Sequence, residues 1–391
     1  MNTHDVVIIG AGPSGISAGI TLLRNGVDCL IIDKCEFPRF KLCGGLLTAK
    51  TLTHLKLQGI HEIHDILVNT CKKVCIARKN EYIADLKCSE SLHLVHRPTF
   101  DKLLLDKFIK QGGEFLQGEV IAIDKINKTI TLSNQEAISY SHLIGADGAN
   151  GITQQYVRTS KLYYAKGCGI IIPKKKLTFN NDRILINLGL FHDGFLCEFP
   201  KGDSITIGCL CSQSKHDSLN LPVFFQNYLQ TQHNYAVEIN EIKQALVPYN
   251  WHCTEITNHQ GSILLVGDTG GYSTCIPGDG IYGALISGEF AATAIIHSKT
   301  SSELSTVLYQ KSMQPHINYY NRVYNNVLIF YAWNEFFLNV IKKNQGLFAS
   351  FLFDTQIAYN TYHFNYFKII LAWWKVKHKY VNIHKITSNE H

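Results

Sequence analysis

The chain has 391 residues, of which 46% are hydrophobic and 17% are charged, and its net charge is +6. The low charged fraction suits a large buried interior or an apolar substrate. The positive charge is compatible with an anionic membrane surface, a pyrophosphorylated substrate or a pyridine nucleotide. No basic run with interleaved aromatic residues has a nucleic-acid-binding frame, so nucleic acid is not expected as a partner.

Residues 6–33 have the pattern of a dinucleotide-binding strand, turn and helix. An apolar run predicts a buried parallel strand that ends at Gly10, where glycine permits a tight turn. Gly12 lets the backbone approach a pyrophosphate, and Gly15 lets the helix expected over residues 14–25 pack close on the sheet. The start of that helix offers unpaired N–H groups to the phosphates. The residues expected to hold a cofactor in this turn are Gly10, Gly12, Pro13, Ser14 and Gly15.

A second strand, expected over residues 29–32, ends at Asp33. This carboxylate follows the glycines by about 20 residues, where it can accept hydrogen bonds from a ribose diol. An acid here suits a ribose with a free 2′-hydroxyl, as in FAD or NAD, and it repels a 2′-phosphate. The neighbouring Lys34 is also expected to bind the cofactor. This first segment alone does not separate FAD from NAD.

Two later segments repeat the design of a short buried strand that breaks into a glycine turn with a carboxylate. The first turn contains Asp147 and Gly148, and the second contains Gly267 and Asp268. Glycine allows close approach, and an anchored carboxylate accepts hydrogen bonds from a sugar-like hydroxyl. Three such segments in this order indicate an FAD-binding fold.

A long helix is expected over residues 282–297, directly after the third segment. Gly278, Gly280 and Ile281 lead into it and are expected to bind the cofactor. The N-terminus of this helix would direct positive charge at the pyrimidine edge of a flavin, which favours the anionic reduced form.

A further motif narrows the family. Residues 38–45 resemble the Pro-Arg-x-Lys-x-Cys-Gly-Gly pattern of the geranylgeranyl reductase family, whose FAD enzymes saturate isoprenoid double bonds. Residues 193–203 partly match the Tyr-x-Trp-x-Phe-Pro segment that lines the substrate channel in that family. Phe195 and Cys197 stand in place of its tyrosine and tryptophan. The Trp-x-Trp-x-Ile-Pro motif of the related flavin-dependent halogenases is missing.

The resemblance, which includes the wider aromatic-hydroxylase superfamily, implies roles for single residues. The turn at Asp147 would lie near the pyrophosphate, and Asp268 would bind a ribityl hydroxyl. Arg97, expected just before a helix over residues 102–111, would contact FAD phosphate or ribose. The motif adds further cofactor-binding residues, namely Arg39, Cys43, Gly44 and Gly45. The substrate-binding residues implied are Phe195, Cys197, Phe199 and Pro200.

Cys43 is the residue expected to be catalytic, because it sits in the Gly44–Gly45 turn just past the ribose-binding strand. A thiol there would donate a proton or shape the pocket, and a buried hydrophobic cysteine is the alternative. Arg39 and Lys41 would either meet a substrate pyrophosphate or form surface ion pairs.

The fold expected is α/β, a Rossmann-like FAD-binding domain with an interleaved β-sheet substrate domain and a helical C-terminal region. The FAD-binding domain is expected to be discontinuous, over residues 1–50, 90–155 and 255–300. The substrate domain would comprise residues 51–89 and 156–254, and the helical region residues 301–391. That last region is aromatic-rich but has no apolar run of about 20 residues, which excludes a transmembrane span. Peripheral membrane contact, a cover for the core and a dimer contact are all open for it.

The 12 cysteines include no Cys-x-x-Cys pair, so no metal site is expected. A nucleotide-binding strand at the start of the chain argues against a signal peptide, which predicts a cytoplasmic protein with reduced thiols, with or without membrane association.

The function expected from these patterns is an FAD-dependent oxidoreductase that reduces C=C bonds of an isoprenoid or similar lipid by hydride transfer from reduced FAD. One alternative is an FAD-dependent monooxygenase that hydroxylates an aromatic or polyketide substrate. Another is a flavin- and lipid-binding protein without catalysis. No separate nicotinamide-binding unit is visible, so the electron donor would be a transient NAD(P)H or a ferredoxin-like carrier.

Overall fold

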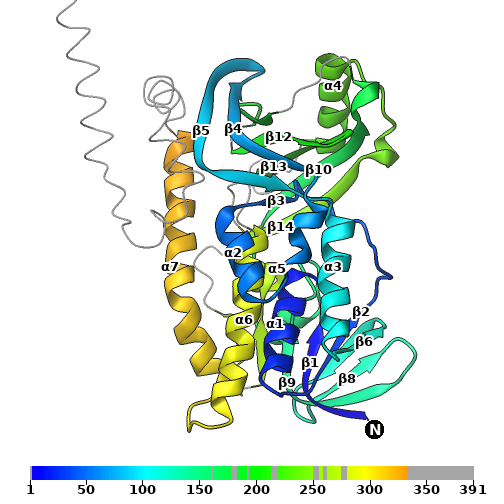
Figure 1. The fold of residues 1–391 in the computed structure, drawn as a ribbon, viewed down its shortest axis with the longest axis vertical. Helices are drawn as coiled ribbons and strands as arrows, with labels where there is room; N and C mark the ends of the chain where they lie inside the picture. The colour runs from blue at the N-terminus through cyan, green and yellow to red at the C-terminus, as the bar shows by residue number, and fades with distance from the viewer. Residues whose placement is uncertain are drawn as a thin grey trace, which may run out of the picture.

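The computed structural model describes most of the chain up to residue 332. The described residues are 2–159, 162–177, 183–191, 193–212, 219–249, 255–258, 262–273 and 280–332. They form two β-sheets at opposite ends of the long axis, with helices packed around the lower one (Figure 1). The predicted α/β fold is thereby confirmed.

The lower sheet, sheet A, is a parallel sheet extended by an antiparallel hairpin. Its parallel strands, in spatial order, are β6 (Glu114–Gln117), β2 (Cys29–Asp33), β1 (Asn2–Ile9), β9 (Ala137–Gly145) and β15 (Ile263–Leu265). The hairpin strands β7 (Val120–Asp124) and β8 (Thr129–Leu132) continue antiparallel from β9. The carboxyl ends of β1, β2, β9 and β15 therefore meet at one edge, where ligands bind in sheets of this kind.

Both faces of sheet A are covered, which explains the unbroken apolar run in β1. Val6 and Ile8 pack in a core with side chains of α1 (Pro13–Arg24), α3 (Arg97–Lys110), α6 (Gly280–Ser298) and α7 (Ser305–Ala332). Val7 and Ile9 point the other way and pack with β7 and β8. The helix α6 contacts both α1 and α7.

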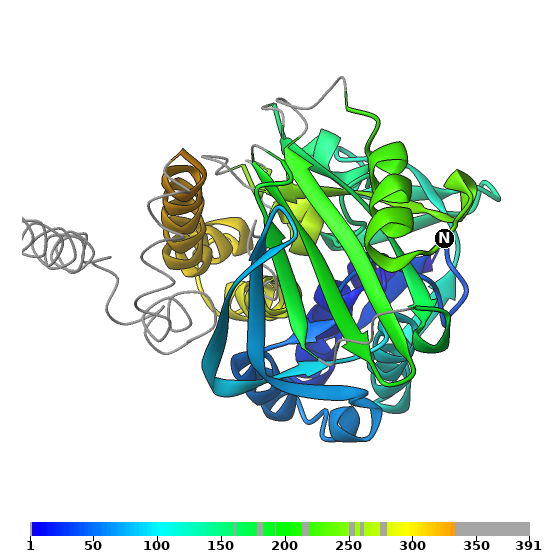
Figure 2. The ribbon, with the colours of Figure 1, turned by 90° about the horizontal axis from the view of Figure 1, so that it is seen from above.

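The upper sheet, sheet B, is antiparallel except where β11 pairs with β4. Its order is β14 (Lys243–Tyr249), β10 (Tyr163–Pro173), β13 (Ser204–Ser212), β12 (Gly194–Lys201), β11 (Ile184–Leu188), β4 (Asn69–Arg78), β5 (Glu81–Leu94) and β3 (Leu46–Leu47). The helix α4 (Leu221–His233) packs against β10, as seen from above in Figure 2. The remaining elements are α2 (Ala49–Leu57), α5 (Gly267–Gly270) and the 3-10 turns η1 (Glu62–Ile66), η2 (Thr153–Tyr156), η3 (Lys174–Lys176) and η4 (Ile239–Glu241).

The start of α3 differs from the prediction. The helix begins at Arg97, not at residue 102, and Pro98 lies in its first turn. Proline is well tolerated there because the first N–H groups of a helix have no partner within the helix. This puts Arg97 on the helix itself, one turn before Asp101.

The C-terminal part is helical where it is described, over α7. The aromatic segments expected beyond residue 332, and Gly278, lie outside the described residues. Within the described part of the chain, no helix is long and apolar enough to cross a membrane.

Candidate cofactor and active site

The glycine turn after β1 is packed tightly on one side and open on another. Gly10 has φ +108°, and a methyl group on it would lie 2.2 Å from the carbonyl oxygen of Ala146. A methyl group on Gly15 would lie 1.9 Å from the oxygen of Gly10. Among the described atoms, a methyl group on Gly12 would meet only Arg39, at 3.7 Å from Nη2. Gly12 also precedes α1 without a side-chain cap, so the start of α1 can bind an anion beside Arg39.

Asp33 anchors this turn at the end of β2. Its Oδ2 accepts a hydrogen bond from the N–H of Ala11 at 2.8 Å, and its Oδ1 accepts one from the N–H of Cys35 at 2.9 Å. The carboxylate is thus held beside the glycines, where the sequence predicts the ribose. Lys34 is separate from this arrangement, since its ammonium pairs with Glu119 at 3.1 Å and its side chain is 66% exposed.

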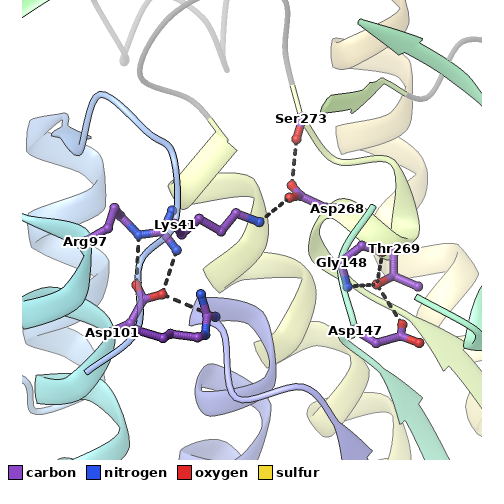
Figure 3. Close-up of polar contacts among 9 residues, drawn as sticks. Lys41, Arg97, Asp101, Asp147, Gly148, Asp268, Thr269 and Ser273 are labelled. Atoms are coloured by element: carbon purple, nitrogen blue, oxygen red, sulfur yellow. Dashed lines mark hydrogen bonds and ion pairs between the residues drawn. The ribbon is translucent and has the colours of Figure 1, made fainter. Parts of the chain in front are cut away.

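Asp147 joins the turn after β9 to α5. Its Oδ2 accepts hydrogen bonds from the N–H and hydroxyl of Thr153 at 2.9 and 2.7 Å. Its Oδ1 accepts one from Thr269 at 3.1 Å (Figure 3). Burial raises the pKa of Asp147, although these hydrogen bonds oppose the rise. Its carboxylate oxygens are therefore occupied by hydrogen bonds within the protein. The neighbouring Gly148 has φ +80°, and a methyl group there would meet no described atom within 4 Å.

Asp268, at the start of α5, is held by two side chains. Its Oδ2 pairs with the ammonium of Lys41 at 2.8 Å, and its Oδ1 accepts a hydrogen bond from Ser273 at 2.8 Å (Figure 3). Burial alone would raise the pKa of Asp268, but Lys41, Ser273 and Arg97 outweigh it and lower the pKa. Lys41 therefore forms an ion pair within the site.

Two guanidinium groups converge on Asp101. Arg97 donates to both of its oxygens, each at 2.8 Å, and both side chains are buried. Arg39 lies 3.4 Å from the same carboxylate, with its guanidinium over the ring of Phe37. Asp101 is absent from the residues predicted from the sequence. Its position four residues after Arg97, one turn along a helix, is the signal that could have found it.

The Cys43 turn packs against the end of β12. A methyl group on Gly44 would lie 2.5 Å from the ring of Phe199, and one on Gly45 would lie 2.1 Å from the oxygen of Val95. Lys201 donates a hydrogen bond to the carbonyl oxygen of Cys43 at 3.4 Å. Two segments that are far apart in the chain, each resembling a reductase motif, thus lie side by side.

The Cys43 thiol has an electropositive environment. Burial alone would raise its pKa, but the guanidinium of Arg97, the N–H of Gly45 and the ammonium of Lys201 lower it. Burial lowers the pKa of Lys201 to about 8, with a further contribution from Arg97. Lys201 was not predicted as a site residue, although it follows the Phe-Pro pair that the sequence shares with the reductase motif.

The predicted substrate residues on β12 divide between two faces, because side chains alternate along a strand. Phe195, Cys197 and Phe199 pack in one apolar cluster with side chains of β4, β5 and β11. Pro200 belongs to the alternate set, and its carbonyl oxygen accepts a hydrogen bond from Asn69 at 2.9 Å.

The start of α6 lies next to the Asp268 site. A methyl group on Gly280 would lie 3.9 Å from the hydroxyl of Ser273, which holds Asp268. Ile281 is buried in the core between the helices and sheet A. The described residues include no cluster of three or more His, Cys, Asp or Glu side chains that could hold a metal ion.

These groups suit FAD. A dinucleotide requires hydrogen-bond donors for its phosphates and acceptors for its sugar hydroxyls. The donors are the uncapped start of α1 and the open backbone at Gly12 and Gly148, and the acceptors are the anchored carboxylates of Asp33 and Asp268. The FAD binding domain family matches residues 3–270, and the chain belongs to that family. The predicted cofactor, FAD, is confirmed.

Relatives agree with the predicted resemblance. An uncharacterized protein of Methanosarcina barkeri is 27% identical over 356 residues, covering 90% of this chain and 88% of that protein. The chloroplastic geranylgeranyl diphosphate reductase of Arabidopsis thaliana is 24% identical over 321 residues, covering 76% and 67%. The chain is thus an FAD-dependent oxidoreductase of the superfamily that contains geranylgeranyl reductases and FAD monooxygenases.

Solved structures show the same fold. A geranylgeranyl bacteriochlorophyll reductase-like protein of Thermoplasma acidophilum superposes with a TM-score of 0.72 at 20% identity, covering 95% of this chain and 96% of that one. A flavin-dependent brominase superposes with a TM-score of 0.70 at 16% identity, covering 91% and 95%.

Proposed function

We propose that the protein reduces C=C bonds of an isoprenoid or similar lipid. The observation that carries this proposal is the contact between the Gly44–Gly45 turn and β12, where Phe199 and Lys201 meet the Cys43 segment. The contact joins the two segments that resemble geranylgeranyl reductase motifs. Relatives named geranylgeranyl diphosphate reductase and digeranylgeranylglycerophospholipid reductase support it.

In this proposal the residues at the edge of sheet A hold the cofactor. Gly12 and the start of α1 bind the pyrophosphate with help from Arg39, Asp33 binds the ribose, and Asp268 binds the ribityl chain. Gly148 leaves room for close approach of the backbone. When bound, FAD supplies the hydride.

The protein supplies the proton and a dry pocket. Cys43 holds a proton at Sγ and donates it to one carbon of the double bond, because its thiol lies in an electropositive turn where the resulting thiolate is stabilised. The apolar cluster that contains Phe195, Cys197 and Phe199 would border this pocket, where it would exclude water and suit a hydrocarbon chain. The electron donor, NAD(P)H or a ferredoxin-like carrier, stays a prediction.

The experiment that tests this function is anaerobic. The FAD-loaded protein is photoreduced and mixed with a prenyl diphosphate or a prenylated lipid, and the visible flavin absorbance is followed. Flavin reoxidation without oxygen, with a mass gain of two hydrogens per double bond in the lipid, supports the reductase. A flavin that stays reduced with every lipid tested contradicts it.

The second candidate function is a monooxygenase. It is favoured by the shared fold of the flavin-dependent brominase and of a protein titled a probable FAD-dependent monooxygenase from Pseudomonas aeruginosa. In the same experiment, reoxidation only after oxygen is admitted, with hydroxylation of an added aromatic compound, identifies this activity. If the FAD-loaded protein binds lipid but shows neither reaction, it is the non-catalytic flavin- and lipid-binding protein.

A further inference from the structure

Lys201 is a buried amine without a carboxylate partner among the described residues. Its side chain ends at the Cys43 turn, and the residue is only 1% exposed. Within the described residues, no carboxylate forms an ion pair with it, whereas the neighbouring Arg97 is paired with Asp101. Burying an unpaired ammonium costs several kcal/mol, so such a group is retained for a reason other than stability.

The groups that face Lys201 come from two segments. Cys43 and Arg97 both interact electrostatically with its ammonium, and burial and the charge of Lys201 both lower the pKa of His96. Only Cys43 can become an anion. Arg97 cannot exchange a proton near neutral pH, because a guanidinium paired with a carboxylate stays charged. The arrangement therefore places one amine beside one thiol, since Nζ of Lys201 lies 3.4 Å from the carbonyl oxygen of Cys43 itself.

We propose that Lys201 returns a proton to Cys43 each time the thiol has protonated a substrate. This inference rests on the proposed reductase function. The S–H bond of Cys43 breaks as its proton goes to the substrate carbon, which leaves a thiolate. An N–H bond of the Lys201 ammonium then breaks and the S–H bond forms again. The neutral amine finally takes a proton from water, and neither side chain changes its oxidation state.

The acidities of both groups agree with this exchange. Burial, with a smaller contribution from Arg97, lowers the pKa of Lys201 to about 8, and the pKa of Cys43 is lowered by Arg97, Gly45 and Lys201 against the effect of burial. An amine whose pKa lies near the operating pH can release a proton to a neighbouring thiolate and then take one back from water. Lys201 acts through Cys43 and not on the substrate itself.

The first test measures the thiol without any substrate. In the FAD-loaded, oxidised protein, alkylation of Cys43 by iodoacetamide is followed by peptide mass spectrometry over a series of pH values. Lys201→Met should lower the thiolate fraction at neutral pH about tenfold, since a neighbouring positive charge is lost. Lys201→Arg should restore it. Lys87→Met, an exposed change of equal charge on β5, should leave the profile unaltered.

Two of the other thiols in the described part of the chain give little background in this assay. Burial raises the pKa of Cys29 to about 12 and that of Cys88 to about 11. An unchanged Cys43 profile in Lys201→Met overturns the proposal. If that variant does not retain FAD, Lys201→Gln, which keeps a polar group but removes the charge, is measured in its place with the same expectation.

The second test separates proton return from charge alone. With lipid and a reductant, Lys201→Met should slow the first reduction per flavin only as far as the Cys43 thiolate loses a stabilising charge, and it should slow the later reductions at least tenfold further. Lys201→Arg should also slow the later turnovers, because its guanidinium does not release a proton. Equal rates in every turnover refute the role of Lys201. A shifted thiol profile with no lipid reduction refutes the reductase and leaves the thiol–amine coupling established.

Discussion

Among single residues, Asp101 has the most demanding environment, because its fully buried carboxylate faces two guanidinium groups. Asp101→Ala should leave Arg97 charged and unpaired in the interior. Breaking a buried pair in this way costs about 3–5 kcal/mol of unfolding free energy. The loss is measured by denaturant unfolding of the protein without FAD.

The same helix offers the control. Asp106 pairs with Lys102 at the same spacing, but both side chains are substantially exposed. Asp106→Ala should therefore cost less than about 1 kcal/mol. Similar losses in the two variants would show that Asp101 does not act as a buried counter-ion.

His54 on α2 gives the stability a pH dependence. Its ring is buried 3.1 Å from Glu289 on α6, and burial lowers its pKa from 6.5 to about 4. The unfolded chain therefore binds a proton between pH 6.5 and 4 that the folded protein does not. The free energy of unfolding should rise with pH across this window, by at most about 3 kcal/mol, and the contribution should be complete above pH 6.5.

His54→Leu isolates this contribution. Burial raises the pKa of Glu289, which acts in the opposite direction, but Glu289 and the other titrating groups remain in both proteins. Guanidinium unfolding of both proteins at several pH values from neutral to acidic should show a shallower slope in the variant. Parallel slopes would mean that His54 is already protonated in the folded state.

At the scale of secondary-structure elements, a close contact between α1 and α6 positions the site. A methyl group on Gly288 would lie 2.1 Å from the carbonyl oxygen of Ser14, in the first turn of α1. Gly288→Ala should push the two helices apart, with a loss of about 1–3 kcal/mol in unfolding free energy. FAD affinity, measured by fluorescence quenching, should fall with it, since the start of α1 moves.

Gly280→Ala on the same helix is the matched control. Its methyl group would approach no described atom closer than 3.9 Å. In the protein without FAD this substitution should leave the stability unchanged or raise it, because alanine favours helix more than glycine does. A Gly288 variant as stable as this control would contradict tight packing of α6 on α1.

Local sequence patterns predicted the helices and strands better than the contacts between residues of different elements. The spacing of Gly10, Gly12 and Gly15 to Asp33 was sufficient to predict the strand, turn and helix, since each step involves neighbouring residues. The start of α3 was missed because proline within a first turn was interpreted as lying before the helix.

The predicted site was incomplete for a different reason. The hydroxyl of Thr269 reaches Asp147 from a segment 122 residues away, and Lys201 reaches Cys43 from a distance of 158 residues. No periodicity or spacing in one sequence reports such pairs. The first pair arises because β9 and β15 are neighbours in sheet A, and the second arises from the packing of β12 of sheet B against the segment after β2.

At the scale of the whole molecule, the contact between the Cys43 turn and β12 connects the two sheets. FAD bound at the edge of sheet A should therefore slow hydrogen exchange in residues 194–201, because the Gly44–Gly45 turn packs on Phe199. Mass spectrometry with and without FAD measures this. Residues 120–132, in the hairpin at the far side of sheet A, should exchange equally in both states. Protection confined to residues 2–33 would show that the sheets respond independently.

The strand order of sheet A also has a consequence for synthesis on the ribosome. The first βαβ segment emerges early, but its neighbour β9 ends only at Gly145, and β15 follows at Ile263. The carboxylate of Asp268 comes later still, so a nascent chain cannot assemble the whole cofactor site until most of it has been translated. Parallel pairings between such distant segments form slowly, which exposes apolar strand edges in the meantime. Production of this protein should consequently be sensitive to temperature and to chaperones.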